Sequence, residues 1–216
     1  MIVVTGGAGF IGSAFIWKLN QLGREDILVV DALDTTDKWK NLVNRRFAEY
    51  SDHKEFLQRV SQNDASLDSV EAVVHMGACS ATTERDANYL MENNYRYTQT
   101  LAEWCLKKEA RFIYASSGAT YGEGADGYSD ADEASLRCKP MNMYGYSKQL
   151  LDVWAIKNGY AAGLVGLKFF NVFGPNEYHK DDMRSVVHKA FGQIRNSGRV
   201  SLFKSHRPEY QDGEQV

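Results

Sequence analysis

The sequence predicts an α/β fold in which helices cover both faces of a doubly wound parallel sheet. Two observations predict it. Short apolar runs alternate with amphipathic helical patterns, and three glycines (Gly6, Gly9 and Gly12) stand between the first apolar run and the first helical pattern. Strands that alternate with helices form βαβ units, which place their strands parallel. The first predicted strands, at residues 2–4 and 26–31, have continuously apolar interiors (IVV and, between two aspartates, ILVV), which is typical of strands buried between two layers of helices.

The glycine-rich turn has the sequence GGAGFIG at residues 6–12, directly after the first predicted strand. In such a turn Gly6 permits the tight bend, Gly9 lets the backbone approach a pyrophosphate, and Gly12 lets the helix pack close to the strand. The helix N-terminus also offers free N–H groups and partial positive charge to phosphates. In this context the spacing indicates a Rossmann-type dinucleotide site, and it resembles the extended short-chain dehydrogenases/reductases. A strand-to-helix turn without a ligand is the alternative.

The first helix is predicted over residues 12–22, because Phe15, Ile16 and Leu19 recur at helical spacing and Gly23 follows. The second strand ends in Asp31, about 20 residues beyond the glycines, where an acidic residue meets the adenosine ribose. We predict further strands near residue 47 and at 70–75, 111–117 and 164–169, and helices at 56–60, 93–108, from about 144, and at 183–195.

Composition excludes several classes of protein. The 216 residues carry a net charge of -3, so we expect no general basic surface and no nucleic-acid partner. The three cysteines (Cys79, Cys105 and Cys138) are scattered without metal-ligand spacing, which argues against a disulfide framework and against a metal site and fits a reducing cytoplasm. The apolar start is too short for a signal peptide, and no run is long enough to span a membrane. We therefore expect a cytoplasmic protein without a membrane partner.

The residues best suited to chemistry are Tyr144 and Lys148, which lie four apart and so share one face of a helix. An ammonium group there is expected to lower the pKa of the phenol, so that Tyr144 can exchange a proton with a substrate alcohol. Lys148 would also hold the cofactor ribose. Ser117 ends a predicted strand, at the sheet edge where ligands of open α/β sheets bind, and would orient the reacting oxygen. A chance surface pair is the alternative for Tyr144 and Lys148.

The identity of the dinucleotide depends on the charges near Asp31. An acid there favours the free 2′-hydroxyl of NAD, whereas the 2′-phosphate of NADP needs cations nearby. The available cations are Lys38, Lys40, Arg45, Arg46 and Lys54. For each of them except Lys38, a solvated surface charge is the simpler interpretation.

Four segments carry a more specific resemblance. They are HMGACSATTE at residues 75–84, NNY at 93–95, YGYSK at 144–148 and FNVFGPNEYHK at 170–180, and they resemble the ADP-L-glycero-D-manno-heptose 6-epimerases. The resemblance implies NADP-dependent inversion of C6 of an ADP-heptose, by oxidation to a ketone and re-reduction, in lipopolysaccharide inner-core synthesis. It implies that Tyr144 and Lys180 are the two proton-transfer groups, and we expect a homo-oligomer. Without the motif, Lys180 could equally be an exposed loop lysine.

The glycine turn, the cations and the resemblance together define the candidate site. The candidate cofactor residues are Gly6, Gly9, Phe10, Ile11, Gly12, Asp31, Ala32, Lys38, Lys54, Met76, Gly77, Ala78, Cys79, Ser80, Asn93, Lys148 and Val172. The candidate substrate residues are Ser117, Asn171, Asp182, Lys189 and Phe203. Ala32, Asp182 and Lys189 depart from the family, in which asparagine, serine and histidine are common at these places.

The domain organisation is predicted as a dinucleotide-binding domain at residues 1–174 and the start of a smaller sugar-nucleotide domain at 175–216. Members of the family are longer, so we expect this chain to lack the C-terminal third. Two other functions stay open. One is a different NAD(P)-dependent sugar-nucleotide epimerase or dehydratase, although a dehydratase typically has an acidic residue beside the catalytic serine, where this chain has Gly118. The other is a chain that binds the dinucleotide without turnover.

Overall fold

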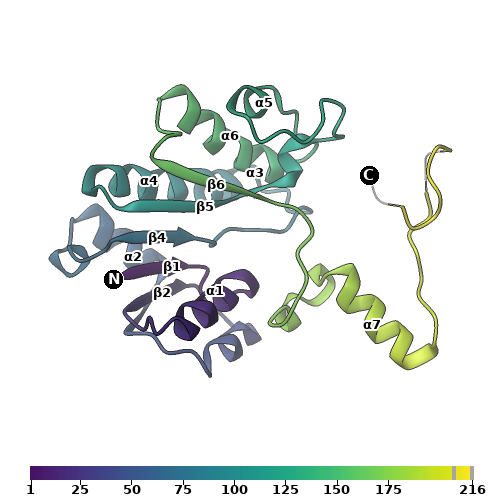
Figure 1. Cartoon of the computed structure of the whole chain (residues 1–216), viewed down its shortest axis with the longest axis horizontal. Helices are drawn as coiled ribbons and strands as arrows, with labels where there is room; N and C mark the ends of the chain where they lie inside the picture. The colour runs from purple at the N-terminus through teal and green to yellow at the C-terminus, as the bar shows by residue number, and fades with distance from the viewer. Residues whose placement is uncertain (206–207, 215–216) are drawn as a thin grey trace.

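A computed structural model describes residues 1–205 and 208–214 of the chain (Figure 1). Its six-stranded sheet has the order β3-β2-β1-β4-β5-β6, and every neighbouring pair is parallel. The strands are β1 (Ile2–Thr5), β2 (Ile27–Asp31), β3 (Glu49–Asp52), β4 (Ala72–His75), β5 (Arg111–Ser117) and β6 (Leu164–Phe169). This confirms the doubly wound α/β prediction. The strand order reverses between β1 and β4, and ligands of such sheets bind beyond the carboxyl ends at that point.

Helices connect the strands in the expected alternation. The α-helices are α1 (Phe10–Gln21), α2 (His53–Ser61), α3 (Ala87–Leu90), α4 (Tyr97–Lys108), α5 (Asp132–Arg137), α6 (Met143–Lys157) and α7 (Val186–Ser197). A π-helical segment, η3 (Met91–Arg96), joins α3 to α4. Short 3-10 helices are η1 (Asp37–Leu42), η2 (Ala65–Leu67), η4 (Gly118–Tyr121) and η5 (Tyr178–Met183).

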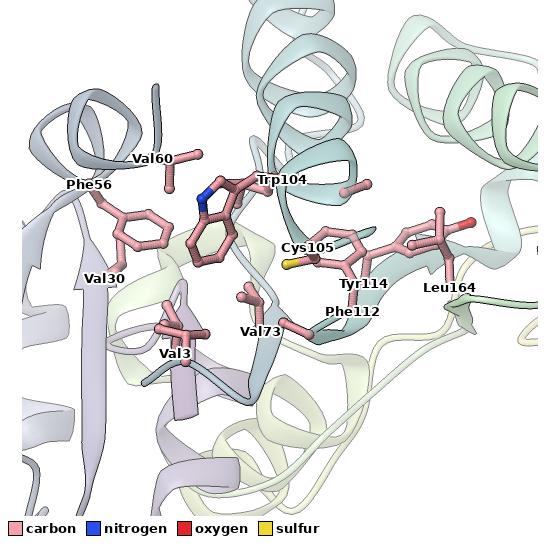
Figure 2. Packing of buried hydrophobic residues seen from close by; sticks show 14 of the residues in the cluster. Val3, Val30, Phe56, Val60, Val73, Trp104, Cys105, Phe112, Tyr114 and Leu164 are labelled. Atoms are coloured by element: carbon pink, nitrogen blue, oxygen red, sulfur yellow. The ribbon is translucent and has the colours of Figure 1, made fainter. Parts of the chain in front are cut away.

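The core lies on both faces of the sheet. On one face α2, α4 and α6 bury Phe56, Trp104 and Leu151 against strand residues such as Val73 and Phe112, as Figure 2 shows for the α2 and α4 side. On the opposite face α1 packs Ile16 and Leu19 against β1, β2 and β4. Each buried side chain of this size contributes about 1.5–3 kcal/mol, so these two clusters hold the carboxyl ends of the strands in place.

The α1 face of the sheet is covered only in part. Val165 and Leu167 of β6 point to that face and are 44% and 40% exposed. Helix α7 has no buried residue and lies away from the sheet (Figure 1). The boundary between a domain at 1–174 and a partial one at 175–216 stays a prediction.

Three segments differ from the sequence-based expectation. The helix predicted from residue 93 begins at Ala87, because the Asp86 side chain accepts a hydrogen bond from the Tyr89 backbone N–H (3.0 Å) and starts the run through α3 and η3. Residues 132–137, which lie outside the predicted helices, form α5. The last helix starts at Val186, where the Ser185 side chain accepts from the His188 N–H.

No helix in the described part of the chain is both long and apolar enough to cross a membrane. Across the same residues there is no group of three or more His, Cys, Asp or Glu side chains that could hold a metal ion.

Candidate active site

The glycine-rich turn is packed too closely to admit side chains at three of its positions, of which Gly6 and Gly12 are the tightest. Gly6 has φ +64°, and a Cβ on it would lie 2.6 Å from the backbone N of Gly77. A Cβ on Gly12 would lie 2.2 Å from the carbonyl oxygen of Gly6, far inside van der Waals contact. Gly9 donates its N–H to the same oxygen (3.0 Å). The turn therefore lies directly against the loop that follows β4.

The start of α1 fits an anionic ligand. Gly9 occupies the N-cap without a capping side chain, and the first turn contains no acidic residue. The first backbone N–H groups of a helix lack intrahelical acceptors and carry partial positive charge, which favours phosphate groups. The residues present at this turn thus fit the pyrophosphate of a dinucleotide.

A cleft of about 620 Å³ opens beside the turn, where β1, β2 and β4 end. It is lined by many of the predicted cofactor residues, namely Gly6, Asp31, Ala32, Lys38, Lys54, Gly77, Ala78, Cys79 and Asn93. It is also lined by residues that the sequence did not single out, including Asp34, His53, Tyr89, Glu92 and Tyr97. The remaining predicted cofactor residues are not among its lining: Gly9, Phe10, Ile11, Gly12, Met76, Ser80, Lys148 and Val172.

Asp31 is the last residue of β2, at the carboxyl end of the strand, and it is 7% exposed. Its carboxylate accepts hydrogen bonds from the backbone N–H groups of Ala8 and Ala32, both at 2.8 Å, and pairs with the Lys38 ammonium at 2.8 Å. Lys54 lines the same cleft but is exposed. An acid and a cation therefore stand together where the adenosine end of a dinucleotide is expected.

Replacing Gly12 by alanine tests the turn. The added Cβ would force the start of α1 away from Gly6, so we expect dinucleotide affinity to fall by at least about a hundredfold and the free energy of unfolding by about 1–3 kcal/mol. Fluorescence titration with NADP and urea denaturation measure the two quantities. Gly192→Ala in α7 serves as a control for glycine replacement in a helix, since no atom lies within 4 Å of its added Cβ and its φ is not positive. NADP affinity in Gly12→Ala within twofold of wild type would contradict the prediction.

The ends of β1 and β4 are joined through a buried histidine. The His75 ring contacts the Thr5 hydroxyl (2.6 Å) through Nδ1 and the Thr98 hydroxyl (2.8 Å) through Nε2. Burial lowers the pKa of His75 to about 3, so the ring is neutral. Thr5 also accepts from the Gly77 N–H (3.2 Å). His75 is therefore a structural residue that fixes the two loops facing the cleft.

Asn94 fixes the loop at residues 76–80 and is almost fully buried. Its side chain accepts from the Cys79 N–H (2.9 Å) and donates to the Cys79 carbonyl (3.0 Å) and to the Ser147 hydroxyl (3.1 Å). The loop is thus tied to α6. The sequence placed Asn93 at the cofactor and left the neighbouring Asn94 without a role, although both lie in the NNY motif.

The structure brings Ser117 and Tyr144 into contact. Ser117 ends β5, and Tyr144 lies in the first turn of α6, which Asn142 caps by accepting from the Gly145 N–H (2.8 Å). Burial raises the pKa of Tyr144, and a hydrogen bond with the Ser117 side chain partly offsets the rise. The expected lowering of this pKa by Lys148 is therefore wrong for the chain without ligands, because desolvation of the phenolate outweighs any such effect.

Lys148 lies one turn further along α6 and is 3% exposed. Burial lowers the pKa of its ammonium to about 8, while the nearby Asp152 and Cys79 work in the opposite direction. A lysine with this pKa is mostly charged at neutral pH and can act as a donor inside the site.

Asp152 and Lys168 form a buried ion pair (2.7 Å) beneath these residues. The Asp152 carboxylate also accepts from the Tyr114 hydroxyl (2.8 Å) and the Ser116 hydroxyl (2.7 Å), and the Lys168 ammonium donates to the Thr120 hydroxyl (2.9 Å). The sequence did not single out either member. The spacing of Lys148 and Asp152, four apart on one helix, is the signal that could have found Asp152.

Lys180 lies on η5, and its side chain is next to the start of α1. Its ammonium lies 5.6 Å from the centre of the Phe10 ring, at the start of α1. The loop around it is closed by the buried Glu177, which accepts from the Gly174 N–H (3.2 Å) and from the N–H and hydroxyl of Ser185 (2.6 and 2.8 Å). Among the described residues, no interaction joins Lys180 to Tyr144.

The other candidate substrate residues are not gathered around Tyr144. Asn171, Asp182, Lys189 and Phe203 are all exposed, with Phe203 at 63%. The Lys189 ammonium donates to the backbone carbonyl of Asp182. Of the predicted substrate residues, only Ser117 is buried beside Tyr144.

Comparison with known proteins matches the chain to one family. Residues 2–216 match the NAD dependent epimerase/dehydratase family. The ADP-L-glycero-D-manno-heptose-6-epimerase of Nitratidesulfovibrio vulgaris is 61% identical over 216 residues, which is all of this chain and 67% of that protein. The enzyme of the same name from Fusobacterium nucleatum is 50% identical, over all of this chain and 66% of that protein.

Solved structures are similar in the same way. The crystal structure of the Helicobacter pylori ADP-L-glycero-D-manno-heptose-6-epimerase superposes with a TM-score of 0.78 at 27% identity, over 94% of this chain and 65% of that one. A Bacillus cereus UDP-glucuronic acid 4-epimerase, solved with UDP-glucuronic acid and NAD, has a TM-score of 0.72 at 25% identity, over 94% of this chain and 65% of that one. This chain thus spans about two thirds of the length of its relatives. It belongs to the NAD dependent epimerase/dehydratase family and groups there with the ADP-L-glycero-D-manno-heptose-6-epimerases.

Proposed function

We propose that the chain supplies the dinucleotide-binding part and the proton-transfer residues of an epimerase that inverts C6 of an ADP-linked heptose. The observation that carries the proposal is the contact of Ser117 with Tyr144, one helical turn from the buried Lys148, at the carboxyl edge of a sheet whose glycine turn fits a pyrophosphate. The choice of an ADP-linked heptose as the substrate is supported by the names of the relatives.

Tyr144 is the proton-transfer group at the reacting oxygen of the substrate. Its raised pKa keeps the phenol protonated at neutral pH, which suits it to donate a proton to a carbonyl oxygen. For the reverse direction the phenolate must be stabilised, and the hydrogen bond from Ser117 and the charge on Lys148 are the available groups. A bound nicotinamide dinucleotide supplies the hydride acceptor and donor for the change at C6.

Inversion requires a second proton-transfer group on the opposite side of the carbon, and we assign it to Lys180. Tyr144 comes from α6, on one face of the sheet, whereas Lys180 lies against the start of α1, which packs on the other face. Tyr144 and Lys180 thus come from opposite faces of the sheet, and this arrangement supports the assignment.

We propose NADP as the dinucleotide, with NAD as the alternative. Lys38 and Lys54 both line the cleft near Asp31, and cations at this place favour a 2′-phosphate. The Bacillus cereus relative, in contrast, was solved with NAD. Asp31 is fully engaged by Ala8, Ala32 and Lys38, so its negative charge is partly neutralised before any ligand arrives.

Lys38→Ala tests this choice. Loss of one charge-assisted hydrogen bond costs about 1.5–3 kcal/mol, so we expect the Kd for NADP to rise by about tenfold or more and the Kd for NAD to rise much less. Titration of both dinucleotides into wild type and variant measures this, with Lys40→Ala as a control, because Lys40 pairs with Asp37 and is exposed. Equal losses for the two dinucleotides would show that Lys38 does not read the 2′-phosphate.

The activity itself is tested by mixing the 216-residue chain with NADP and the ADP-heptose substrate and following inversion at C6 by NMR. Inversion without stoichiometric NADPH supports the epimerase. Stoichiometric NADPH indicates a dehydrogenase, and a product of lower mass indicates a dehydratase. Retained NADP binding without any conversion supports a chain that binds dinucleotide only, a second candidate favoured by the exposure of Asn171, Asp182, Lys189 and Phe203.

We also propose a place in lipopolysaccharide inner-core synthesis, a cytoplasmic location and a homo-oligomeric state. Cys79, Cys105 and Cys138 are all free thiols, which supports a reducing compartment. The uncovered apolar residues of β6 and α7 support association with further polypeptide, for which a second copy is one source.

A further inference from the structure

Asn41 connects three segments that lie far apart in the sequence, and neither the motifs nor the proposed reaction gives it a role. It lies on η1 and is half-buried. Its side-chain Nδ2 is 2.9 Å from the carbonyl oxygen of Ala8, 3.1 Å from that of Asn176 and 3.3 Å from Nδ1 of His179. An amide NH₂ group has two hydrogens, so the two carbonyl bonds can form together and the histidine shares one of them.

On the cofactor side, Asn41 belongs to a closed ring of interactions. Ala8 donates its N–H to the Asp31 carboxylate and accepts from Asn41 at its carbonyl, so both sides of this buried residue are engaged. Asp31 in turn pairs with Lys38 (2.8 Å). Lys38 and Asn41 are three apart on a 3-10 helix, where residues at this spacing lie above one another. A ligand that contacts Asp31 or Lys38 therefore acts on the turn that holds Asn41.

On the other side, Asn41 holds residues 174–184, the segment that carries Lys180. This segment is also anchored to α1, because the Asn176 side chain donates to the Ser13 hydroxyl (3.0 Å) and the Lys180 ammonium lies over the Phe10 ring. Its backbone has positive φ at Asn176 (+77°) and Asp181 (+43°), conformations that surrounding contacts must maintain. The bond from Asn41 to the Asn176 carbonyl links it to η1.

We propose that Asn41 is a positioning residue, which couples the adenosine end of the dinucleotide cleft to the segment that carries Lys180. The significance for catalysis rests on the proposed role of Lys180. When a dinucleotide contacts Lys38 and Asp31, η1 becomes more rigid, and the amide of Asn41 passes this restraint to Asn176 and His179. The segment with Lys180 is then held against α1 more firmly when the cleft is filled.

Hydrogen–deuterium exchange of the 216-residue chain, with and without saturating NADP, tests the coupling directly. In wild type we expect NADP to slow exchange in peptides covering residues 174–184 about fivefold, which is the factor that a net hydrogen-bond free energy on the order of 1 kcal/mol produces. In Asn41→Ala the slowing at 174–184 is expected to fall below about twofold, while the slowing at the glycine turn is retained. Asn44→Ala, an exposed asparagine just beyond η1, is the matched control and should behave as wild type.

The exchange experiment can contradict the coupling through Asn41 in two ways. Equal slowing at 174–184 in wild type and Asn41→Ala, or no slowing there in wild type while the glycine turn is protected, overturns the coupling. If Asn41→Ala fails to fold, Asn41→Asp tests the same path, because it keeps the size of the side chain and replaces the donor Nδ2 by an oxygen that cannot donate to the carbonyls of Ala8 and Asn176. It should likewise lose the slowing at 174–184, and full slowing would count against the proposal. Absence of protection at the glycine turn contradicts dinucleotide binding itself, whereas failed C6 inversion with intact coupling contradicts only the proposed reaction.

Discussion

Tyr144→Phe is expected to lower the rate of C6 inversion by about a thousandfold, which is the usual contribution of a positioned acid–base group. The variant keeps the ring and loses only the hydroxyl that contacts Ser117. Tyr144 does not line the cleft of about 620 Å³ beside the glycine turn. We therefore expect the Kd for NADP to stay within about twofold of wild type, a smaller change than the loss of a hydrogen bond to the ligand would cause. NMR of the sugar carbon and fluorescence titration with NADP measure the two quantities.

Tyr146→Phe is the matched control, since Tyr146 is two residues away on α6 and 46% exposed. It should retain the wild-type rate. Lys180→Met should lose inversion as completely as Tyr144→Phe if the two residues are the two proton-transfer groups. A wild-type rate in Lys180→Met would remove the second assignment, and a residual rate above about a tenth of wild type in Tyr144→Phe would remove the first.

Lys168→Met is expected to lower the free energy of unfolding by about 3–5 kcal/mol, because it leaves the Asp152 carboxylate buried without its counter-ion. The side chains of Lys168 and Asp152 are 12% and 6% exposed, so water replaces little of the lost interaction. The variant also removes the donor to Thr120, whose hydroxyl donates to the Ser117 carbonyl (2.8 Å), and should therefore loosen the end of β5. Urea denaturation followed by circular dichroism gives the free energy.

Lys168→Arg separates charge from shape and should lose no more than about 1 kcal/mol, the scale of one imperfect hydrogen bond. Adding Asp152→Asn to Lys168→Met should recover part of the loss, because the amide removes the unpaired charge, its oxygen can accept from the hydroxyl of Tyr114 or Ser116, and its NH₂ group can donate to the other hydroxyl oxygen. A loss below about 1 kcal/mol in Lys168→Met would show that the pair is not a stabilising centre.

Residues with local signals were predictable. The glycine turn, Asp31, Ser117, Tyr144 and Lys148 each depend on a spacing or on a position at the end of a strand, and the structure places them at the carboxyl edge of the sheet. Their roles as ligands or catalysts stay predictions. The resemblance found in the four motifs was confirmed by relatives at 61% and 50% identity.

Residues that act through distant partners were not predictable. Asn41 is separated from Asn176 by 135 positions, and Asn94 from Ser147 by 53, so no local pattern reveals either contact. The expected lowering of the Tyr144 pKa failed for a related reason, since the extent of burial is a property of the assembled core. The start of the helical run at Ala87 is a different case, because the cap by Asp86 reaches only three residues and is a local signal that the prediction did not use.

By itself the sequence determined the α/β class, the glycine turn and the spacing of Tyr144 and Lys148, because periodicity and backbone freedom are local properties of the chain. The tertiary structure alone decided which charges are neutralised and which side chains meet. Lys38 pairs with Asp31, Lys168 with Asp152, and Lys180 lies at α1 rather than at Tyr144. These outcomes depend on burial and on contacts between remote segments, which exist only once the sheet has assembled.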